Sequence, residues 1–133
     1  MSILQQLAQY LSACPALGSV GTGSLQEVPC AYLLAGKSAA AQDITGARQH
    51  TLQYTLVVRR TALESSDDAA LADTLQHAAA WVNAKDAAGQ LPLLAGYTAD
   101  SLAAEGGTML NTDDSGIATA NMRLVLQCRE GEE

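Results

Sequence analysis

The sequence predicts an α+β fold, with a mostly antiparallel sheet of about four to five strands and two helices packed on one face. Two patterns lead to this prediction. Apolar residues recur every three or four positions in residues 65–85, as on one side of a helix. They recur at every second position in residues 51–60 and 118–129, as in strands with one buried face. Such strands are typical of an antiparallel sheet that has helices on one side.

The composition indicates a single domain that spans residues 1–133 and buries one core. Seven basic and fourteen acidic residues give a formal net charge of −7, which argues against a protein that holds DNA or RNA through phosphate contacts. No run reaches the roughly 18 apolar residues that a membrane span needs. The first residues, MSILQQLAQYL, also lack the basic segment of a signal peptide. We therefore expect a soluble, non-secreted protein without a membrane partner.

Three cysteines, Cys14, Cys30 and Cys128, form an odd set without C-x-x-C spacing. Such a set fits reduced thiols in a cytoplasmic protein better than a disulfide framework. We interpret them as small buried side chains and not as metal ligands or redox groups.

The N-terminal residues predict a first helix with an apolar stripe of Ile3, Leu4, Leu7 and Leu11. Pro15 limits this helix, because the residue before a proline disfavours the helical conformation. A helix packed on its own domain is favoured over a detachable peptide that docks on a partner.

Residues 17–34 predict two short strands. Val20 is the strongest strand former in residues 17–27, and the segment 28–34 (VPCAYLL) contains Pro29, which suits a sheet edge or a strand start. The triplet Gly21-Thr22-Gly23 resembles a phosphate-binding loop, but it lacks the further glycine and the strand–loop–helix setting. A turn is the better interpretation of this triplet.

Residues 35–49 (AGKSAAAQDITGARQ) predict a long flexible loop, because their side chains are too small and polar to build a core. Loops longer than about 12 residues in a compact domain are usually functional or disordered. Fixing each residue costs about 1 to 2 kcal/mol of backbone entropy, which these side chains cannot offset alone. We therefore expect this loop to be mobile in the free subunit.

The central strand and helix, residues 51–60 and 65–85, are the clearest elements. Ser65 or Ser66 can cap the helix, and Trp81 is expected at the edge of its buried stripe. The residues expected to share one core are Leu52, Tyr54, Leu56, Val58, Leu71, Leu75, Val82, Met122, Leu124 and Leu126.

Residues 87–107 mix apolar groups with turn formers, and Leu91, Leu93 and Leu94 are expected to plug one end of the core. Residues 108–111 and 118–129 predict a hairpin around Asp113-Asp114-Ser115-Gly116. A calcium loop is disfavoured there, because the wider ligand spacing and the distal glutamate are missing. Residues 130–133 predict a solvated tail.

Motifs for catalysis, cofactors or metals are not found in the sequence. His50 and His77 stand in no recognisable spacing with cysteine or acidic residues, and no nucleotide or hydrolase fingerprint occurs. Zinc held by the scattered cysteines and histidines is disfavoured, because each ligand would come from a different element. We therefore expect a structural or interaction protein without catalytic residues, cofactor or metal.

Four segments together resemble one protein family: HTLQYTLVVRR, LADTLQHAAAWVNA, QLPLLAGYTA, and MRLVLQCR after the D-D-S-G turn. They are similar to the minor capsid or tail terminator proteins of long-tailed bacteriophages and prophages. In that family, an alternating strand that ends in basic residues precedes a helix with a Trp-aliphatic pair, here Trp81-Val82. A Leu-Pro step, here Leu91-Pro92, and a C-terminal hairpin follow.

The resemblance implies a small α+β subunit of a homo-oligomeric, hexameric ring on the end of the tail tube. Such a ring stops polymerisation of the tail tube protein, meets the head-completion protein, and catalyses no reaction. DNA would pass through it without specific binding. The resemblance also implies assembly in the host bacterial cytoplasm and a final place in the virion tail.

The loop of residues 35–49 would then become ordered against a neighbouring subunit or the tail tube. The residues taken as the candidate assembly interface are Lys37, Asp43, Arg48, Arg59, Asp113 and Asp114. Two alternatives stay open. One is another head–tail connector or tail tube component, and the other is a small ligand-binding or regulatory domain outside phages, with polar groups that converge in a concave pocket.

Overall fold

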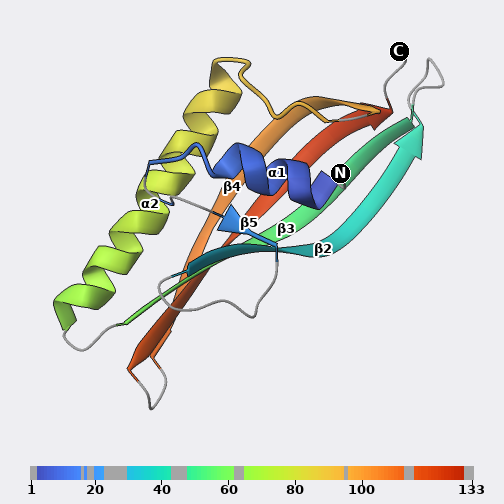
Figure 1. Cartoon of the computed structure of the whole chain (residues 1–133). Coiled ribbons are helices and arrows are strands. Elements are labelled where there is room, and N and C mark those ends of the chain that lie inside the picture. The colour runs from blue at the N-terminus through green and yellow to red at the C-terminus, as the bar shows by residue number, and fades with distance from the viewer. Residues whose placement is uncertain are drawn as a thin grey trace.

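The computed structural model describes residues 3–15, 17, 20–22, 30–42, 48–61, 65–94, 96–112 and 116–130. The elements in chain order are α1 (Ile3–Leu11), β1 (Val20–Gly21), β2 (Cys30–Gln42), β3 (Arg48–Thr61), α2 (Ser65–Ala87), β4 (Tyr97–Thr112) and β5 (Ile117–Glu130). The five strands form one sheet in the order β1-β2-β3-β5-β4 (Figure 1). α2 packs mainly on β4, and α1 packs on β1 and β2.

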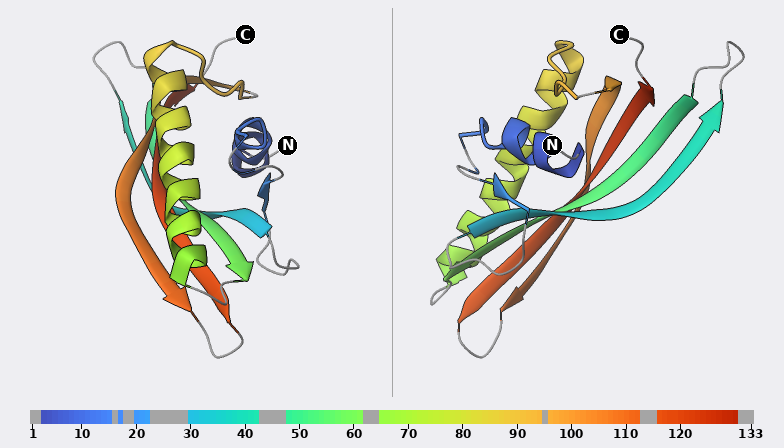
Figure 2. Two further views of the ribbon diagram at one scale, coloured as in Figure 1. Left: turned by 90° about the vertical axis from the view of Figure 1, so that its left-hand side faces the viewer. Right: turned by 45° about the vertical axis from the view of Figure 1, so that its right-hand side comes forward.

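The fold class is α+β, as the sequence predicts, but the sheet differs from the expected one. β1 runs parallel to β2, whereas the pairs β2–β3, β3–β5 and β4–β5 are antiparallel, so the sheet is mixed. Its long strands also twist and curl strongly (Figure 2). The prediction of a mostly antiparallel sheet under two helices is therefore too simple. The direction of β1 could not be predicted from the sequence, because a strand of two residues shows no periodicity that would indicate its orientation.

One hydrophobic core joins the sheet to both helices. All the residues expected to share it are buried there, except Leu52, which is partly buried against it. The two-residue period of β3 and β5 explains the arrangement, since Tyr54 pairs with Leu124 and Leu56 with Met122 on the same face. Burying each large aliphatic side chain contributes about 1.5 to 3 kcal/mol, so this face holds the elements together.

The central helix α2 confirms the predicted stripe, because Leu71, Leu75, Ala78 and Val82 are buried. The helix ends in a Schellman motif at Gly89, whose φ of 73° suits glycine. In this motif the amide of residue 90 donates to the carbonyl of residue 85 at 2.8 Å, and that of residue 89 to residue 86 at 3.0 Å. The motif sets the direction in which the chain leaves α2.

The first helix, α1, packs on its own domain and buries Leu7, Ala8 and Leu11. Just after it, the Ser12 hydroxyl donates to the Ala8 carbonyl at 2.9 Å and accepts the Val20 amide at 3.0 Å. This serine ties the end of α1 to β1. In the part of the chain that the structure describes, neither helix is long and apolar enough to cross a membrane.

Residues 35–49 are not the long loop that the sequence predicts. Residues 35–42 belong to β2, and residues 48–49 open β3. The pairing runs from Ala35–Tyr54 to Gln42–Arg48. The small side chains of this segment do not indicate a strand in the sequence, because strand propensity depends mostly on how side chains pack. The backbone nevertheless forms its hydrogen bonds with β3. Only residues 43–47 of the expected loop lie outside the described residues.

Residues 97–107 are also strand, although the sequence predicts a loop before residue 108. The reason is that β4 shifts register between Ala99 and Ser101 and again between Glu105 and Met109. The first shift, with one extra residue on β4, moves the following side chains to the other face. The second, with two extra residues, interrupts the regular pairing without changing the face, and together they hide the two-residue period. β5 has no such shift with β3, and its alternation confirms the predicted arm of the hairpin.

Candidate assembly surface

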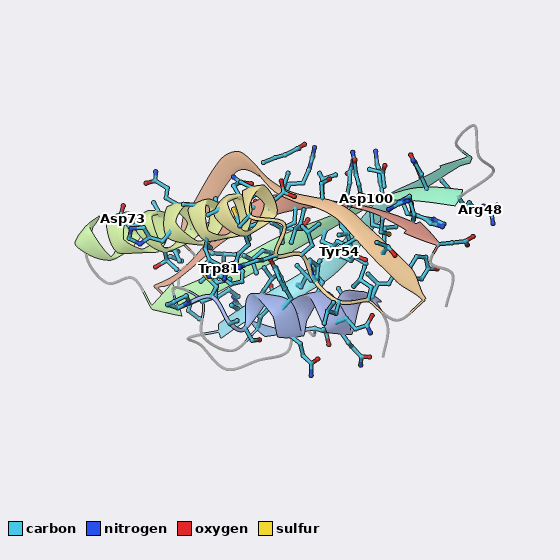
Figure 3. All side chains as sticks on the ribbon, turned by 90° about the horizontal axis from the view of Figure 1, so that it is seen from above. Arg48, Tyr54, Asp73, Trp81 and Asp100 are labelled. Atoms are coloured by element: carbon cyan, nitrogen blue, oxygen red, sulfur yellow. The ribbon has the colours of Figure 1, made fainter. Side chains whose placement is uncertain are left out.

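The distal hairpin, which we define as residues 36–42 of β2 and 48–49 of β3, carries two of the predicted interface residues. Lys37 lies where β2 shifts register between Ala35 and Ser38, and Arg48 is the partner of Gln42 in the register. Residues 36–40, 48 and 49 are exposed on both faces of the sheet. Figure 3 shows Arg48 at the far end of the molecule, away from Trp81 and the helices. Lys37 and Arg48 thus lie on the same projecting hairpin, five positions apart in the register of β2.

Gly36 is needed at this bend of β2. A Cβ atom at this position would lie 3.0 Å from the Gln53 carbonyl oxygen on β3. Only glycine lets the two backbones approach this closely without a shift. A glycine inside a strand-like segment is the sequence signal of such an irregularity.

The remaining predicted interface residues do not join this pair. Arg59 lies near the other end of β3, where it pairs with Cys30 and Thr119. It is eleven residue steps along β3 from Arg48, which corresponds to roughly 36 Å at about 3.3 Å per step. Asp43, Asp113 and Asp114 lie outside the described residues. Of the three described residues, Arg59 therefore does not lie on the hairpin that carries Lys37 and Arg48.

The two outer edges of the sheet differ in their protection. On β4, the amide of Leu102 donates to Asp86 Oδ1 at 3.0 Å, and the amide of Ala104 donates to Asn83 Oδ1 at 3.1 Å. Both acceptors belong to α2, so the helix caps this edge. On the other edge, β1 pairs only with Ala31 and Tyr32, and no other described strand covers the rest of β2. An unpaired edge of this kind is available to another chain.

Charged pairs cross the exposed face of β4 and β5. Arg129 Nε lies 3.0 Å from both carboxylate oxygens of Asp100, and Arg123 lies 3.6 Å from Glu105. These side chains are largely exposed, so water screens the pairs and each contributes little to stability. They fix side-chain positions on the face that neither helix covers.

An apolar hollow of about 400 Å³ lies between the turn after α1 and the middle of α2. Cys14, Pro15, His77 and Trp81 line it. The Trp81 ring packs at 5.3 Å and 55° on the Tyr10 ring, and Lys85 Nζ lies 5.6 Å from its centroid. These contacts hold the indole in place as a wall of the hollow. We call this site the Trp81 hollow.

The connection from α2 to β4 presents a second apolar feature. Leu93 is 93% exposed, although the sequence predicts that it plugs the core. Its neighbours Pro92 and Leu94 are buried, and they anchor the segment. Apolar character alone could not reveal which leucine of this segment points outward. Sequence reasoning missed both Leu93 and the Trp81 hollow as surface features.

Buried titratable groups stay neutral in the core. Burial raises the pKa of Tyr54 to about 12, with a smaller contribution from Cys128. Burial and then Asp100 raise the pKa of the Cys128 thiol. Cys14 and Cys128 are free and buried, as expected from the sequence. The side chain of Cys30 is not described. Within the described ranges, no group of three or more histidine, cysteine or acidic residues is arranged to hold a metal ion.

No family model matches the chain, and no curated protein matches it. A chain in the solved structure "Virion of native gene transfer agent (GTA) particle" is similar, with a TM-score of 0.52 and 17% identity. The match covers 98% of this chain and 100% of that chain. At this identity the similarity shows a shared fold, which extends over nearly the whole length of both chains.

Proposed function

We propose that this chain is a structural subunit of a phage-like virion, and that it forms a ring which terminates the tail tube and connects it to the head. One observation carries the proposal. The fold matches that of a chain in a gene transfer agent virion over 98% of this chain and all of the other. The resemblance of the sequence to tail terminators supports the same class of protein. It rests on short sequence segments, whereas the structural similarity rests on the overall fold.

The distal hairpin supports assembly with further copies. It projects from the core, exposes both faces, and carries Lys37 and Arg48. Lys37, Arg48 and Asp43 give residues 35–49 a net charge of +1. Because the whole chain has a net charge of −7, the remainder has a net charge of −8. A basic hairpin of one copy is therefore complementary to the acidic body of the next. Head-to-tail contacts of this kind close into rings when the rotation between copies permits.

The proposed role is structural and not catalytic. In a ligand-binding domain, several polar groups would converge in a concave pocket. The Trp81 hollow has a different chemistry, because His77 is the only described lining residue with a polar ring. It suits an apolar side chain better than a polar small molecule. This property favours the assembly role over the ligand-binding alternative.

The test is to inactivate the gene in the genome that encodes the protein and to examine particles by electron microscopy. A terminator stops tube growth, so its loss should give tubes of uncontrolled length that are not joined to heads. Loss of a tube subunit should instead give no tubes, and loss of a connector should give unattached tails of normal length. Restoring the native gene is the control. Normal tails joined to heads in the inactivated strain would contradict any such role.

A further inference from the structure

Leu93 is an unusual surface residue in this molecule. It is 93% exposed, and the other large exposed hydrophobic among the described residues, Leu34, reaches only 39%. Leaving a leucine in water forgoes most of the gain that burial would give it. A single exposed leucine is ordinary, but this one stands on a segment whose other features suit a contact.

The segment holds Leu93 in a fixed position. The Schellman motif at Gly89 sets the exit from α2, and the Tyr10 hydroxyl donates to the Gln90 carbonyl at 2.6 Å. A bridge between Leu94 and Tyr97 closes the far side. A side chain on a fixed backbone loses less entropy when it binds. The Leu93 side chain is therefore a protrusion that is already in position before binding, and we call it the knob.

The segment of chain that carries Leu93 has no charged residue of its own. Residues 88–99 contain no lysine, arginine, aspartate or glutamate, in a chain with a net charge of −7. Two acidic copies repel each other over most of their surfaces. Contact through an uncharged segment reduces this repulsion. Depletion of charge is the mark of the centre of an interface.

The Trp81 hollow has the size and chemistry to receive a leucine. Its volume of about 400 Å³ lies within the range of pockets that enclose small molecules. Tryptophan is among the residues that dominate binding energy in interfaces, and Trp81 is held here by Tyr10 and Lys85. Pro15 supplies a rigid second wall.

The segment that carries Leu93 and the Trp81 hollow lie at different levels along α2. In Figure 1 the connection from α2 to β4 runs to the right from the upper end of α2, whereas the turn after α1 lies to the left, beside the middle of α2. Leu93 therefore does not serve the hollow of its own subunit. We propose that Leu93 inserts into the Trp81 hollow of a second copy of this chain, as the central apolar contact between neighbouring subunits. The inference rests on the proposed ring, and a heterologous contact of this kind is what a ring requires.

Cysteine cross-linking tests the contact directly. One sample carries Leu93→Cys, a second carries His77→Cys, and the two are mixed under mild copper–phenanthroline oxidation. His77 lines the hollow and is exposed, so its replacement leaves the core intact. We expect a disulfide-linked dimer in the mixture that exceeds the dimer in either single sample. The double variant should give a ladder of linked subunits. Gln76→Cys, one residue away on the exposed side of α2, is the matched control and should not cross-link.

Non-covalent variants test the energy of the contact. Leu93→Ser should weaken the association of subunits about ten- to hundred-fold, the usual effect of removing a central apolar anchor. Leu34→Ser removes the other exposed leucine and should leave association unchanged. His77→Trp fills the hollow and should weaken association as Leu93→Ser does, whereas Gln76→Trp should not. Sedimentation velocity over a range of concentrations gives these values.

The outcomes separate this contact from the proposed function. Rings that form normally with Leu93→Ser, without cross-links between the cysteine variants, would overturn the contact and leave the ring in place. Specific cross-links in a protein whose loss leaves virions intact would retain the contact and overturn the virion role. Subunits that show neither association nor cross-links would contradict both.

Discussion

At the scale of single residues, Tyr54 shows how the core controls a titratable group. It lies on β3 with only 6% of its surface exposed, facing the core that β5 and the helices complete. Burial disfavours the charged phenolate, and the neighbouring Cys128 adds to the effect, so the pKa rises to about 12. The core thus stays uncharged over the whole physiological pH range.

This shift predicts a loss of stability in strong base. The folded-state pKa of about 12 exceeds the ordinary value of 10.0, so between these values the unfolded chain releases a proton that the folded chain keeps. The contribution is complete below pH 10 and is lost toward pH 12, by about 2 to 3 kcal/mol for two pKa units. Urea unfolding at several pH values should show a shallower decline in Tyr54→Phe. An equally steep decline in this variant would contradict the assignment.

Leu75 tests the packing of the core. It is fully buried on the inner side of α2. Leu75→Ala should lower the free energy of unfolding by roughly 2 to 5 kcal/mol, the usual range for a buried leucine and the cavity it leaves. Gln76→Ala, on the exposed side of the same helix, should change it by less than about 0.5 kcal/mol. Urea unfolding gives both values, and equal effects would show that the stripe of α2 is misplaced.

At the scale of elements, the sequence predicts those that bury one face without interruption. Residues 65–85 and 51–60 match α2 and β3 closely, and residues 118–129 match β5, because regular burial imposes a regular period. β2 and β4 are longer than predicted, since each contains a register shift that breaks the period. The apolar period of a strand shows which of its faces is buried, so the period is lost where a register shift changes the buried face.

The sequence could predict only that part of the candidate surface whose residues are close to one another along the chain. Lys37 and Arg48 lie on the same hairpin because β2 and β3 are consecutive antiparallel strands. Arg59 lies too far along the same strand. The Trp81 hollow depends on how α1 meets α2, and the exposure of Leu93 depends on the exit from α2. Such contacts between distant segments leave no local pattern in the sequence.

The caps that α2 provides to the edge of β4 make a prediction at this scale. Asp86→Ala removes the acceptor of the Leu102 amide and should cost about 1 to 3 kcal/mol, as for other hydrogen bonds to charged groups. Hydrogen exchange at Leu102 should become faster. Asp86→Asn keeps an acceptor and should restore most of the protection. Asp73→Ala is the control, because Asp73 lies exposed near the start of the same helix (Figure 3), thirteen residues or roughly 20 Å before Asp86.

At the scale of the whole molecule, stability and assembly are assigned to different parts. The core joins both helices to one end of the curled sheet, whereas the hairpin residues whose burial is described, 36–40, 48 and 49, are all exposed. A protein that needed only to fold could end β2 near Ala35 and β3 near His50, where the contacts with the core stop. The additional strand length is therefore expected to serve contacts with other molecules.

Trimming the distal hairpin tests this separation. The register suggests a conservative design, in which Asn-Gly replaces residues 42–48 between the paired Ala41 and Gln49. Two-residue loops of this sequence fit the twist of paired strands. Because the pair Ala41–Gln49 and all the pairs between it and the core are kept, the melting temperature should fall by no more than a few degrees.

The trimmed protein should nevertheless fail to form rings or to complement a strain that lacks the native gene. The full-length variant Lys37→Ala with Arg48→Ala separates the roles of charge and length. If electrostatic complementarity dominates, this variant should associate more slowly, and the difference from the native protein should shrink as salt is added. If strand length dominates, it should assemble normally while the trimmed protein does not. A trimmed protein that assembles and terminates tails like the native one would show that the hairpin is dispensable, and the ring contacts would then have to lie on the helices and on the connection that carries Leu93.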